Sequence, residues 1–375
     1  MTVNPSSAPK KTLGNVVVIG GCGFLGHHIV NLLHDTYASK ISVLDLRTTR
    51  NRHSSSSISY YDSDITSLSS LISIFGYIKP DVVIHTASPT LIGAGHELYY
   101  KVNVEGTKSV IEACQKTGVK ALVYTSSASV ISDNVNDLMN ADERWPVIPA
   151  ASQTEYYSTT KAEAEALVLA ANRSPTAPQL LTCALRPAGI FGEGDVQMLP
   201  PIINVYHTNK TGFQLGENKN LFDFTYVVNV AHAHLLSANA LLQTSKLSTA
   251  PLDHEKIDGE AFFVTNDEPV YFWDFTRAVW KAAGSDKGTE HVWVIGKDTG
   301  MAIGALLEWA MWCLGRTPKL TRRQVRYSSM TRYYDCGKAK RRLGYKPLVG
   351  LQEGITRSVE WFEEQRTKEE EKKGQ

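Results

Sequence analysis

The chain has 375 residues, of which 42% are hydrophobic and 21% are charged, and its formal net charge is +1. These values are ordinary for a globular protein with a large core, and they give no electrostatic reason to expect a nucleic-acid partner. The length fits two to three domain-sized units, or one large α/β unit with an added lobe.

The cysteines and histidines do not form a metal-binding pattern. None of the five cysteines (22, 114, 183, 313 and 336) are spaced as Cys-x-x-Cys, and the nearest histidine pair, His232 and His234, is two residues apart. We therefore expect no metal. An odd number of cysteines without a signal peptide fits a reducing compartment.

Short apolar runs alternate with helical patterns in the first half of the chain. The first run, Asn15-Val-Val-Val-Ile19, is continuous and β-branched, which is typical of a parallel strand buried on both faces. Further strands are predicted at 41–45, 81–85, 121–125 and 180–185, helices from residue 24, at 100–117 and at 156–171, and a turn at 64–66. This alternation predicts an α/β fold with a doubly wound, parallel Rossmann sheet and a smaller mixed C-terminal substrate lobe.

The composition along the chain suggests where these units begin and end. We expect a disordered lead at 1–12, a dinucleotide-binding Rossmann domain at 13–190, a substrate lobe at 191–365 and a charged tail at 366–375, with some later segments interleaving with the Rossmann domain. Within the lobe, residues 300–315 are strongly apolar but short for a transmembrane helix.

A glycine-rich turn follows the first strand, with glycines at 20, 23 and 26 before the first helix. Glycine permits the tight turn, the approach of a pyrophosphate to the backbone, and close packing of the helix on the sheet, while the helix N-terminus attracts the anion. Asp45 ends the next strand and is suited to bind the ribose hydroxyls. It favours NAD, but Arg47 could pair with a phosphate and leaves NADP open.

Tyr157 and Lys161 lie four residues apart on a predicted helix and therefore share one face. An ammonium group and a positive nicotinamide ring would stabilise the tyrosine phenolate, which could then take a proton from an alcohol. The pair alone is not specific, but it follows a dinucleotide-binding turn and the hydroxyl-rich strand end Thr125-Ser126-Ser127. We favour Ser127 over Ser126 as the residue that holds the substrate oxygen.

These motifs resemble those of the extended short-chain dehydrogenases/reductases and, within them, the 3β-hydroxysteroid dehydrogenase family. More narrowly, the stretches 20–28, 124–130, 140–146 and 186–195 are similar to those of the fungal sterol-4α-carboxylate 3-dehydrogenases (decarboxylating), and the resemblance covers roughly residues 13–365. One departure is Val228, where related proteins usually carry an acidic residue.

The resemblance implies a role for each matching residue. Tyr157 would be the catalytic acid/base, Lys161 would lower its pKa and bind the nicotinamide ribose, and Ser127 would hold the substrate oxygen. The implied cofactor-binding residues are Gly20, Gly23, Phe24, Leu25, Gly26, Asp45, Asp64, Ile65, Thr86, Ala87, Asn103, Tyr157, Lys161 and Pro187.

The resemblance also implies the reaction and its setting. We expect NAD(P)-dependent oxidation of the 3β-hydroxyl of a 4α-carboxysterol with loss of carbon dioxide, in sterol (ergosterol) biosynthesis. The expected partners are a second copy of the chain, other enzymes of sterol C-4 demethylation, and the cytosolic face of the endoplasmic reticulum membrane. Segment 300–315 would then either touch the membrane or form a core helix.

Three alternatives remain at this point. The substrate could be a steroid or triterpenoid without a carboxylate, in which case no cationic partner is needed; Arg186, Arg322 and Arg326 are the candidates for that partner. The same fold also serves nucleotide-sugar epimerases and dehydratases. Finally, the chain could bind a dinucleotide without turnover, which the intact Ser127, Tyr157 and Lys161 argue against.

Overall fold

Strand β1 (Asn15–Ile19) lies inside a seven-stranded parallel sheet of order β12-β7-β5-β4-β1-β2-β3 in the computed structural model, which describes residues 10–89, 95–318 and 320–373. Its apolar side chains are fully buried, because helices cover both faces of the sheet. The other strands are β2 (Lys40–Asp45), β3 (Ser59–Asp62), β4 (Val82–His85), β5 (Ala121–Thr125), β7 (Leu181–Pro187) and β12 (Glu260–Val264). The predicted Rossmann fold class is confirmed.

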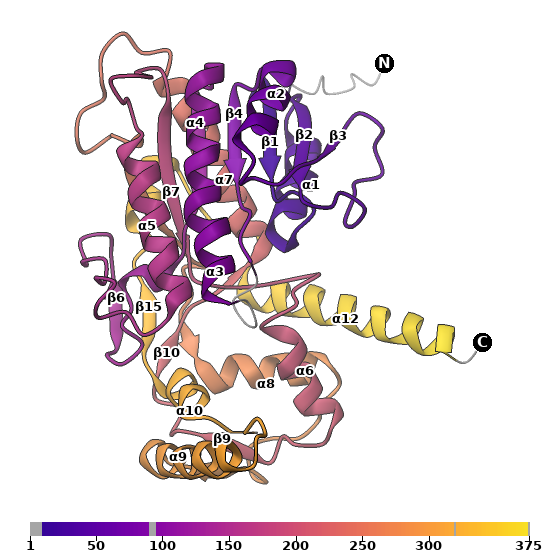
Figure 1. Ribbon diagram of the computed structural model, residues 1–375. Helices are drawn as coiled ribbons and strands as arrows, with labels where there is room; N and C mark the ends of the chain where they lie inside the picture. Colours follow the sequence, from indigo (N-terminus) through magenta and orange to yellow (C-terminus); the bar gives the residue numbers. More distant parts are fainter. Residues whose placement is uncertain (1–9, 90–94, 319, 374–375) are drawn as a thin grey trace, which may run out of the picture.

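Two sets of helices cover the sheet (Figure 1). Helices α1 (Phe24–Thr36) and α7 (Val227–Thr244) share one apolar core with it, and α2 (Leu68–Ile78), α4 (Thr107–Thr117) and α5 (Tyr156–Ala170) share the other. The predicted helix at 100–117 is present, but its first part is a π-helix, η1 (Tyr100–Gly106), after the short α3 (His96–Tyr99).

Two elements between residues 46 and 80 are absent from the sequence prediction. Strand β3 is an edge strand of four residues whose sequence, Ser-Tyr-Tyr-Asp, lacks a buried apolar run, and the serine-rich α2 buries only Leu71, Phe75 and Ile78. Neither pattern is periodic enough to be distinguished from a loop, because burial comes from neighbouring elements rather than from local sequence.

The second lobe is built around the four-stranded sheet β13-β10-β15-β6, with the two-stranded pairs β11-β8 and β14-β9. Its strands are β6 (Leu138–Ala141), β8 (Gly189–Phe191), β9 (Phe213–Leu215), β10 (Leu221–Phe222), β11 (Phe224–Tyr226), β13 (Val270–Tyr271), β14 (Trp293–Ile295) and β15 (Arg332–Tyr334). The remaining helices are the 3-10 helix η2 (Ala128–Ile131), α6 (Leu199–His207), α8 (Phe272–Ala282), α9 (Lys297–Cys313), α10 (Arg322–Ser329), α11 (Gly337–Leu343) and α12 (Leu351–Lys373).

The chain passes between the two lobes more than once. Strand β6 lies before residue 190 but joins the sheet of the second lobe, while α7 and β12 lie after it and join the Rossmann sheet. The division at residue 190 stays a prediction. Of the expected lead at 1–12 and tail at 366–375, residues 1–9 and 374–375 lie outside the described part of the chain, and residues 366–373 continue α12.

Helix α9 contains most of the apolar segment 300–315, and it is not a core helix. Only Gly300 and Gly304 are buried, whereas Trp309 and Trp312 are 64% and 79% exposed. The alternative that this segment forms a buried core helix is therefore wrong. Within the described residues no helix is both long and apolar enough to cross a membrane.

We predict that Gly26→Ala destabilises the protein, because a Cβ at position 26 would lie 2.0 Å from the Gly20 carbonyl oxygen. Relieving that overlap is expected to cost about 1–3 kcal/mol or more. The control is Gly76→Ala on α2, where a Cβ meets nothing within 4 Å. It should stabilise the helix by about 0.5–1 kcal/mol. The measurement is the midpoint of thermal unfolding, and a Gly26→Ala midpoint equal to that of the wild type would contradict the prediction.

Candidate active site

The glycine turn joins β1 to α1 with little room for side chains. Gly20 has φ +78°, and a Cβ there would lie 2.8 Å from both the Ala87 nitrogen and Thr86 Oγ1. Thr86 is fixed in turn by a 2.9 Å hydrogen bond from its hydroxyl to the Ile19 carbonyl. No side chain caps α1, which begins at Phe24 and Leu25, so its first N–H groups remain available to an anion. The turn therefore fits a pyrophosphate.

The acidic residues expected at the adenosine end lie at the tips of neighbouring strands. Asp45, at the end of β2, accepts a 3.0 Å hydrogen bond from the Cys22 N–H, which ties the ribose-binding carboxylate to the glycine turn. Asp64 accepts hydrogen bonds from Thr66 just after β3, and Ile65 is buried against η1, where a Cβ on Gly106 would lie 2.6 Å from it. These positions are consistent with an adenosine site.

Two of the expected cofactor residues belong to the supporting structure. Asn103 is 1% exposed, and its amide donates to the Thr160 hydroxyl at 3.0 Å, which links η1 to the helix that carries Tyr157. Its Oδ1 is buried without a hydrogen-bond partner among the described residues. Pro187 ends β7 and pairs with Val264 of β12.

Tyr157 projects from the first turn of α5 toward the end of β5. Its phenol hydrogen-bonds with Ser88 and Ser127, and its ring packs edge-on against Tyr99 with centroids 5.8 Å apart. The Ser126 hydroxyl is buried without a partner among the described residues, so Ser127 is the serine that the fold brings to the tyrosine. The neighbouring Tyr156 stacks on His96 instead.

Lys161 is buried one turn farther along α5, with 2% of its surface exposed. Its ammonium donates to the Thr125 carbonyl at 2.7 Å and to the Tyr124 hydroxyl at 3.3 Å. The Thr125 hydroxyl pairs at 2.7 Å with His234 Nε2 from α7. Sequence analysis gave no role to Tyr124 or His234, because only the packing of α7 on the sheet places them around the lysine.

Burial controls the ionisation of both residues. It lowers the pKa of Lys161 to about 7, an effect that the nearby Glu165 charge opposes. Burial raises the pKa of Tyr157 to about 12, although its hydrogen bond with Ser88, and to a lesser extent that with Ser127, acts in the other direction. The phenol is therefore neutral at physiological pH in the protein alone, and its activation requires the positive charge that an oxidised nicotinamide brings.

One arginine that the sequence analysis did not consider lies beside this site. Arg332 of β15 donates from Nε to the Tyr334 hydroxyl at 2.7 Å, and that hydroxyl contacts the carbonyl of Ala128, the neighbour of Ser127, at 3.5 Å. The guanidinium is half-buried and has no carboxylate partner in the described part of the chain. A buried cation without a counter-charge is costly, which suggests a site for an anion.

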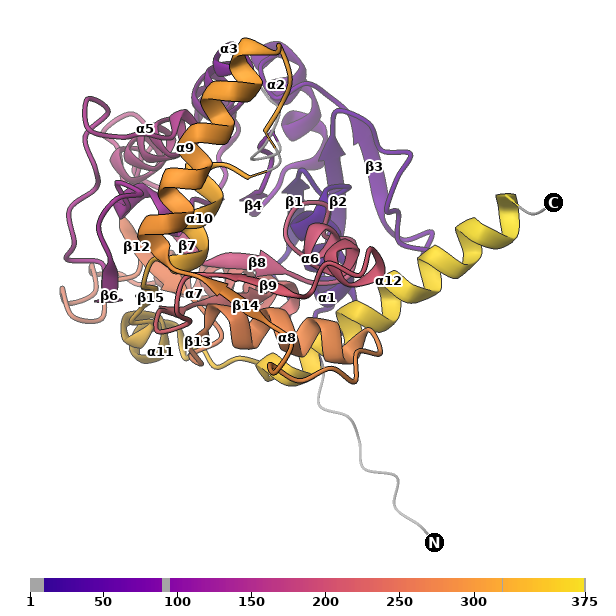
Figure 2. The same cartoon turned by 90° about the horizontal axis from the view of Figure 1, so that it is seen from below.

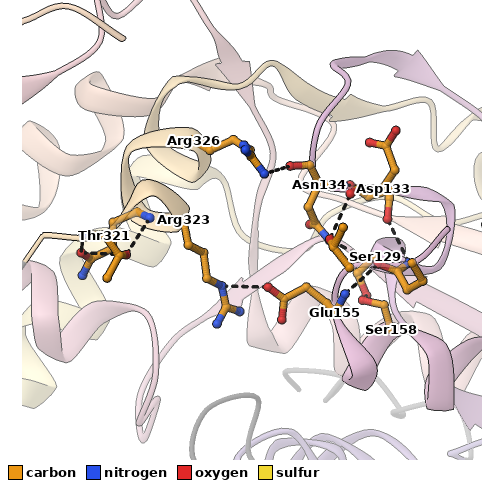
Figure 3. A network of polar contacts seen from close by, with 12 residues as sticks. Ser129, Asp133, Asn134, Glu155, Ser158, Thr321, Arg323 and Arg326 are labelled. Atoms are coloured by element: carbon orange, nitrogen blue, oxygen red, sulfur yellow. Dashed lines mark hydrogen bonds and ion pairs between the residues drawn. The ribbon is translucent and has the colours of Figure 1, made fainter. Parts of the chain in front are cut away.

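Two of the three arginines named from the sequence are engaged in ion pairs elsewhere. Arg186 forms a buried ion pair with Glu165 at 2.5 Å, and Arg322 pairs with Glu308 of α9. Arg326 reaches the Asn134 carbonyl at 3.4 Å. In Figure 3 it lies beside Arg323, whose ion pair with Glu155 at 3.0 Å links α10 to the start of the catalytic helix.

The comparisons with known proteins identify the family. The sequence profile described as the 3-beta hydroxysteroid dehydrogenase/isomerase family matches residues 17–294. The chain belongs to this family. It is 42% identical to sterol-4-alpha-carboxylate 3-dehydrogenase ERG26, decarboxylating, of Saccharomyces cerevisiae over 94% of this chain and 99% of that protein. It is 35% identical to the Homo sapiens sterol-4-alpha-carboxylate 3-dehydrogenase, decarboxylating, over 96% and 90%.

Solved structures share the fold of this family member at low sequence identity. The Bordetella bronchiseptica enzyme WbmH in complex with NAD⁺ matches with a TM-score of 0.69 at 18% identity, over 95% of this chain and 99% of that one. The UDP-glucose 4-epimerase of Thermotoga maritima with UDP-glucose gives 0.69 at 20% identity, over 94% and 99%. These likenesses concern the fold alone.

We predict that Ser127→Ala lowers kcat/KM for NADH formation from a 3β-hydroxysteroid by roughly 10- to 100-fold, because a hydrogen bond to a developing charge is worth about 1.5–3 kcal/mol. Ser126→Ala is the matched control and should stay near wild type, since its buried hydroxyl has no hydrogen-bond partner among the described residues and does not bond to Tyr157. Equal losses in both variants would contradict the assignment.

Proposed function

We propose that this protein oxidises the 3β-hydroxyl of 4α-carboxysterols with NAD⁺ and releases the C-4 carboxylate as carbon dioxide, giving a 3-ketosterol in sterol biosynthesis. The names of the relatives support the substrate class. The observation that carries the proposal is the Arg332 guanidinium, which has no carboxylate partner among the described residues and is linked through Tyr334 to Ala128, the neighbour of Ser127. A substrate carboxylate would supply the missing negative charge.

Three side chains have separate roles in the oxidation step. NAD⁺ supplies the hydride acceptor. The phenolate of Tyr157 takes the proton of the 3β-hydroxyl as hydride leaves carbon 3, while Ser127 holds the oxygen. Lys161, held at the Thr125 carbonyl, brings its amino group to the same face of α5 as the phenol.

Decarboxylation then follows from the product of that step. Oxidation gives a β-keto acid, in which the carbonyl at carbon 3 accepts the electron pair of the bond to the carboxyl carbon as carbon dioxide leaves. The protonated Tyr157 and Ser127 are placed to hydrogen-bond the enolate oxygen that forms. Arg332 orients the carboxylate through a charge-assisted hydrogen bond while Tyr157 and Ser127 hold the 3β-hydroxyl for oxidation.

NAD rather than NADP is the proposed cofactor. The Asp45 carboxylate, held by the Cys22 N–H, would repel a 2′-phosphate. Arg47 is exposed at the same strand end and argues for NADP. The ratio of kcat/KM for NAD⁺ and NADP⁺ tests this choice, and a preference for NADP⁺ would overturn it.

The expected surroundings belong to the same proposal. We place the protein at the cytosolic face of the endoplasmic reticulum, as a homodimer working beside the other enzymes of C-4 demethylation. The apolar substrate and the exposed tryptophans of α9 support the membrane setting, and the adjacent α4 and α5 offer a helical surface for a dimer. Organelle fractionation tests the membrane location, and light scattering tests the homodimer. A monomer found in the cytosol would overturn both statements.

The first test supplies purified protein with NAD⁺ and either a 4α-carboxysterol or the matching 3β-hydroxysterol without the carboxylate. We expect equal amounts of NADH and carbon dioxide from the carboxysterol and little NADH from its counterpart. NADH from the non-carboxylated sterol, with little from the carboxysterol, would favour a plain hydroxysteroid dehydrogenase instead. If no sterol gives NADH, the remaining alternatives are a nucleotide-sugar epimerase or dehydratase and a protein that binds a dinucleotide without turnover.

The second test concerns the carboxylate partner. Arg332→Gln should lower kcat/KM for the carboxysterol at least about tenfold, since it removes a charge-assisted hydrogen bond, and should change the small activity on the non-carboxylated sterol much less. Arg332→Lys should restore part of the preference. Arg366→Gln, which removes an exposed arginine on α12, is the charge-matched control.

The variant Arg326→Gln tests whether Arg326 or Arg332 binds the substrate carboxylate. If Arg326→Gln rather than Arg332→Gln abolishes the preference for the carboxysterol, the assignment moves to α10. If Arg332→Gln lowers the activity on both sterols equally, Arg332 supports the fold and does not bind the substrate carboxylate.

A further inference from the structure

The buried Lys161 is surrounded by neutral oxygen atoms. Its ammonium donates to the Thr125 carbonyl at 2.7 Å and to the Tyr124 hydroxyl at 3.3 Å, and it lies 4.8 Å from the centre of the Tyr124 ring. Within the described part of the chain no carboxylate bonds to it, because Glu165, one turn farther along α5, pairs with Arg186. The charge of the lysine therefore depends on how these neutral groups are oriented.

The Tyr124 hydroxyl begins a chain of hydrogen bonds that leads away from the lysine. It bonds to the hydroxyl of Thr107, the first residue of α4, and Thr107 Oγ1 lies 3.1 Å from Nε2 of His85 at the end of β4. Tyr124 is 1% exposed, and Thr107 and His85 are fully buried. Solvent water therefore does not compete for these bonds, which connect the lysine of α5 to β5, α4 and β4.

The number of donors gives this chain a direction. An ammonium group has donors only, so the Tyr124 oxygen accepts from Lys161. The phenol hydrogen then goes to Thr107 Oγ1, and the threonine hydrogen goes to His85 Nε2. If His85 donated from Nε2 instead, Thr107 would donate to Tyr124, and the phenol hydrogen would be left without an acceptor among these groups. A buried donor without an acceptor is costly, which favours the first direction.

His85 is suited to end the chain as an acceptor. Burial lowers its pKa to about 3, and the charge of Lys161 acts in the same direction, so the ring is neutral. Its Nδ1 is buried without a hydrogen-bond partner among the described residues, so no acceptor or donor there opposes a hydrogen on Nδ1. A neutral imidazole with its hydrogen on Nδ1 has a free lone pair on Nε2.

A second histidine has the same arrangement next to the other acceptor of the lysine. His234 Nε2 lies 2.7 Å from the Thr125 hydroxyl, and His234 Nδ1 lies 2.8 Å from the Val230 carbonyl. The carbonyl requires a hydrogen on Nδ1, which leaves Nε2 to accept. Figure 2 shows α5, which carries Lys161, on one side of β4 and α7, which carries His234, on the other. Each residue that accepts from the lysine is thus linked to a buried histidine.

The charge of Lys161 is set by groups from several elements. The titratable side chains around it and Tyr157 are Glu165 of α5, Tyr99 of α3, His85 of β4, Tyr124 of β5 and His234 of α7. Burial lowers the pKa of Lys161 to about 7, and the Glu165 charge opposes this effect. Burial also lowers the pKa of His234 to about 4, so both histidines are neutral near pH 7 and can act as acceptors.

We propose that His85, acting through Thr107 and Tyr124, is a positioning residue that stabilises the charged form of Lys161. The acceptor at the far end turns each hydroxyl hydrogen away from the ammonium and each oxygen lone pair toward it. A stabilised ammonium lowers the pKa of the Tyr157 phenol one turn away and favours the phenolate. This role rests on the proposed function only because it concerns the same oxidation step, and it holds whichever sterol is oxidised.

The first test measures kcat/KM for NADH formation from a 3β-hydroxysterol against pH, at saturating NAD⁺. Thr107→Val has nearly the same shape and breaks the chain. The pKa of Lys161 should then fall and that of Tyr157 rise, which moves the inflection of the acidic limb about one pH unit upward. At pH 7 we expect a loss of about tenfold in kcat/KM. Thr107→Ser keeps the hydroxyl and should restore most of both values.

Thr276→Val is the matched control. Thr276 is 4% exposed, and its hydroxyl donates to the Phe272 carbonyl at 3.1 Å within α8 of the second lobe. This variant should lower the midpoint of thermal unfolding as Thr107→Val does, but leave the inflection where it is. Tyr124→Phe should move the inflection upward, whereas Tyr345→Phe, which also loses a buried phenol hydrogen bond, should not. An unmoved inflection in Thr107→Val, or equal shifts in both threonine variants, would overturn the proposal.

The tautomer of His85 gives a readout that needs no substrate. Nitrogen-15 NMR of the full-length protein with labelled histidine rings distinguishes protonated from unprotonated ring nitrogens, and His85→Gln identifies the His85 signals by their loss. At pH 6, where the ammonium is mostly charged, we expect the hydrogen on Nδ1, as on His234, which is the internal reference. A hydrogen on Nε2 would overturn the inference. Absence of NADH from every sterol would refute the proposed function and leave this measurement unaffected.

Discussion

The catalytic centre depends on the burial of one ammonium group. Lys161 lies almost fully inside the protein, so its charge has to be met by fixed oxygens, and the Thr125 carbonyl and Tyr124 hydroxyl provide them. These contacts tie α5 to the end of β5. Because Tyr157 is one turn away on the same helix, the direction of its phenol and its approach to Ser127 follow from the position of the lysine.

A second layer of polar contacts keeps that arrangement in place. His234 from α7 holds the Thr125 hydroxyl, Asn103 from η1 holds Thr160, and Arg186 from β7 forms a buried ion pair with Glu165, one turn of α5 beyond Lys161. These contacts come from three different elements on both faces of the sheet. Breaking any one of them would leave a buried polar group without its partner, which costs more than the bond contributes when intact.

The residues that the proposed function assigns to substrate selection belong to the second lobe and not to the Rossmann sheet. The Rossmann sheet is shared with proteins that act on nucleotide sugars, so it does not by itself select a sterol. The features that the proposal assigns to sterol selection lie in β15, where Arg332 is linked through Tyr334 to the neighbour of Ser127, and in α9, whose apolar side chains are exposed. Both belong to the second lobe, and neither is part of the dinucleotide-binding frame.

The sequence by itself determined what short-range patterns can encode: the buried strands from Asn15 to Leu185, the glycine turn and the shared helix face of Tyr157 and Lys161. These follow from side-chain period, backbone freedom and helical spacing, which act over a few residues. Only the tertiary structure decided that Arg186 and Arg322 are taken up by ion pairs and that Arg332 is linked through Tyr334 to the neighbour of Ser127, because these contacts join residues distant in the chain. It also decided that the apolar α9 is exposed. An apolar helix has the same local pattern in a core and on a surface, and the contacts of Gly300 and Gly304 with α10 determine which it is.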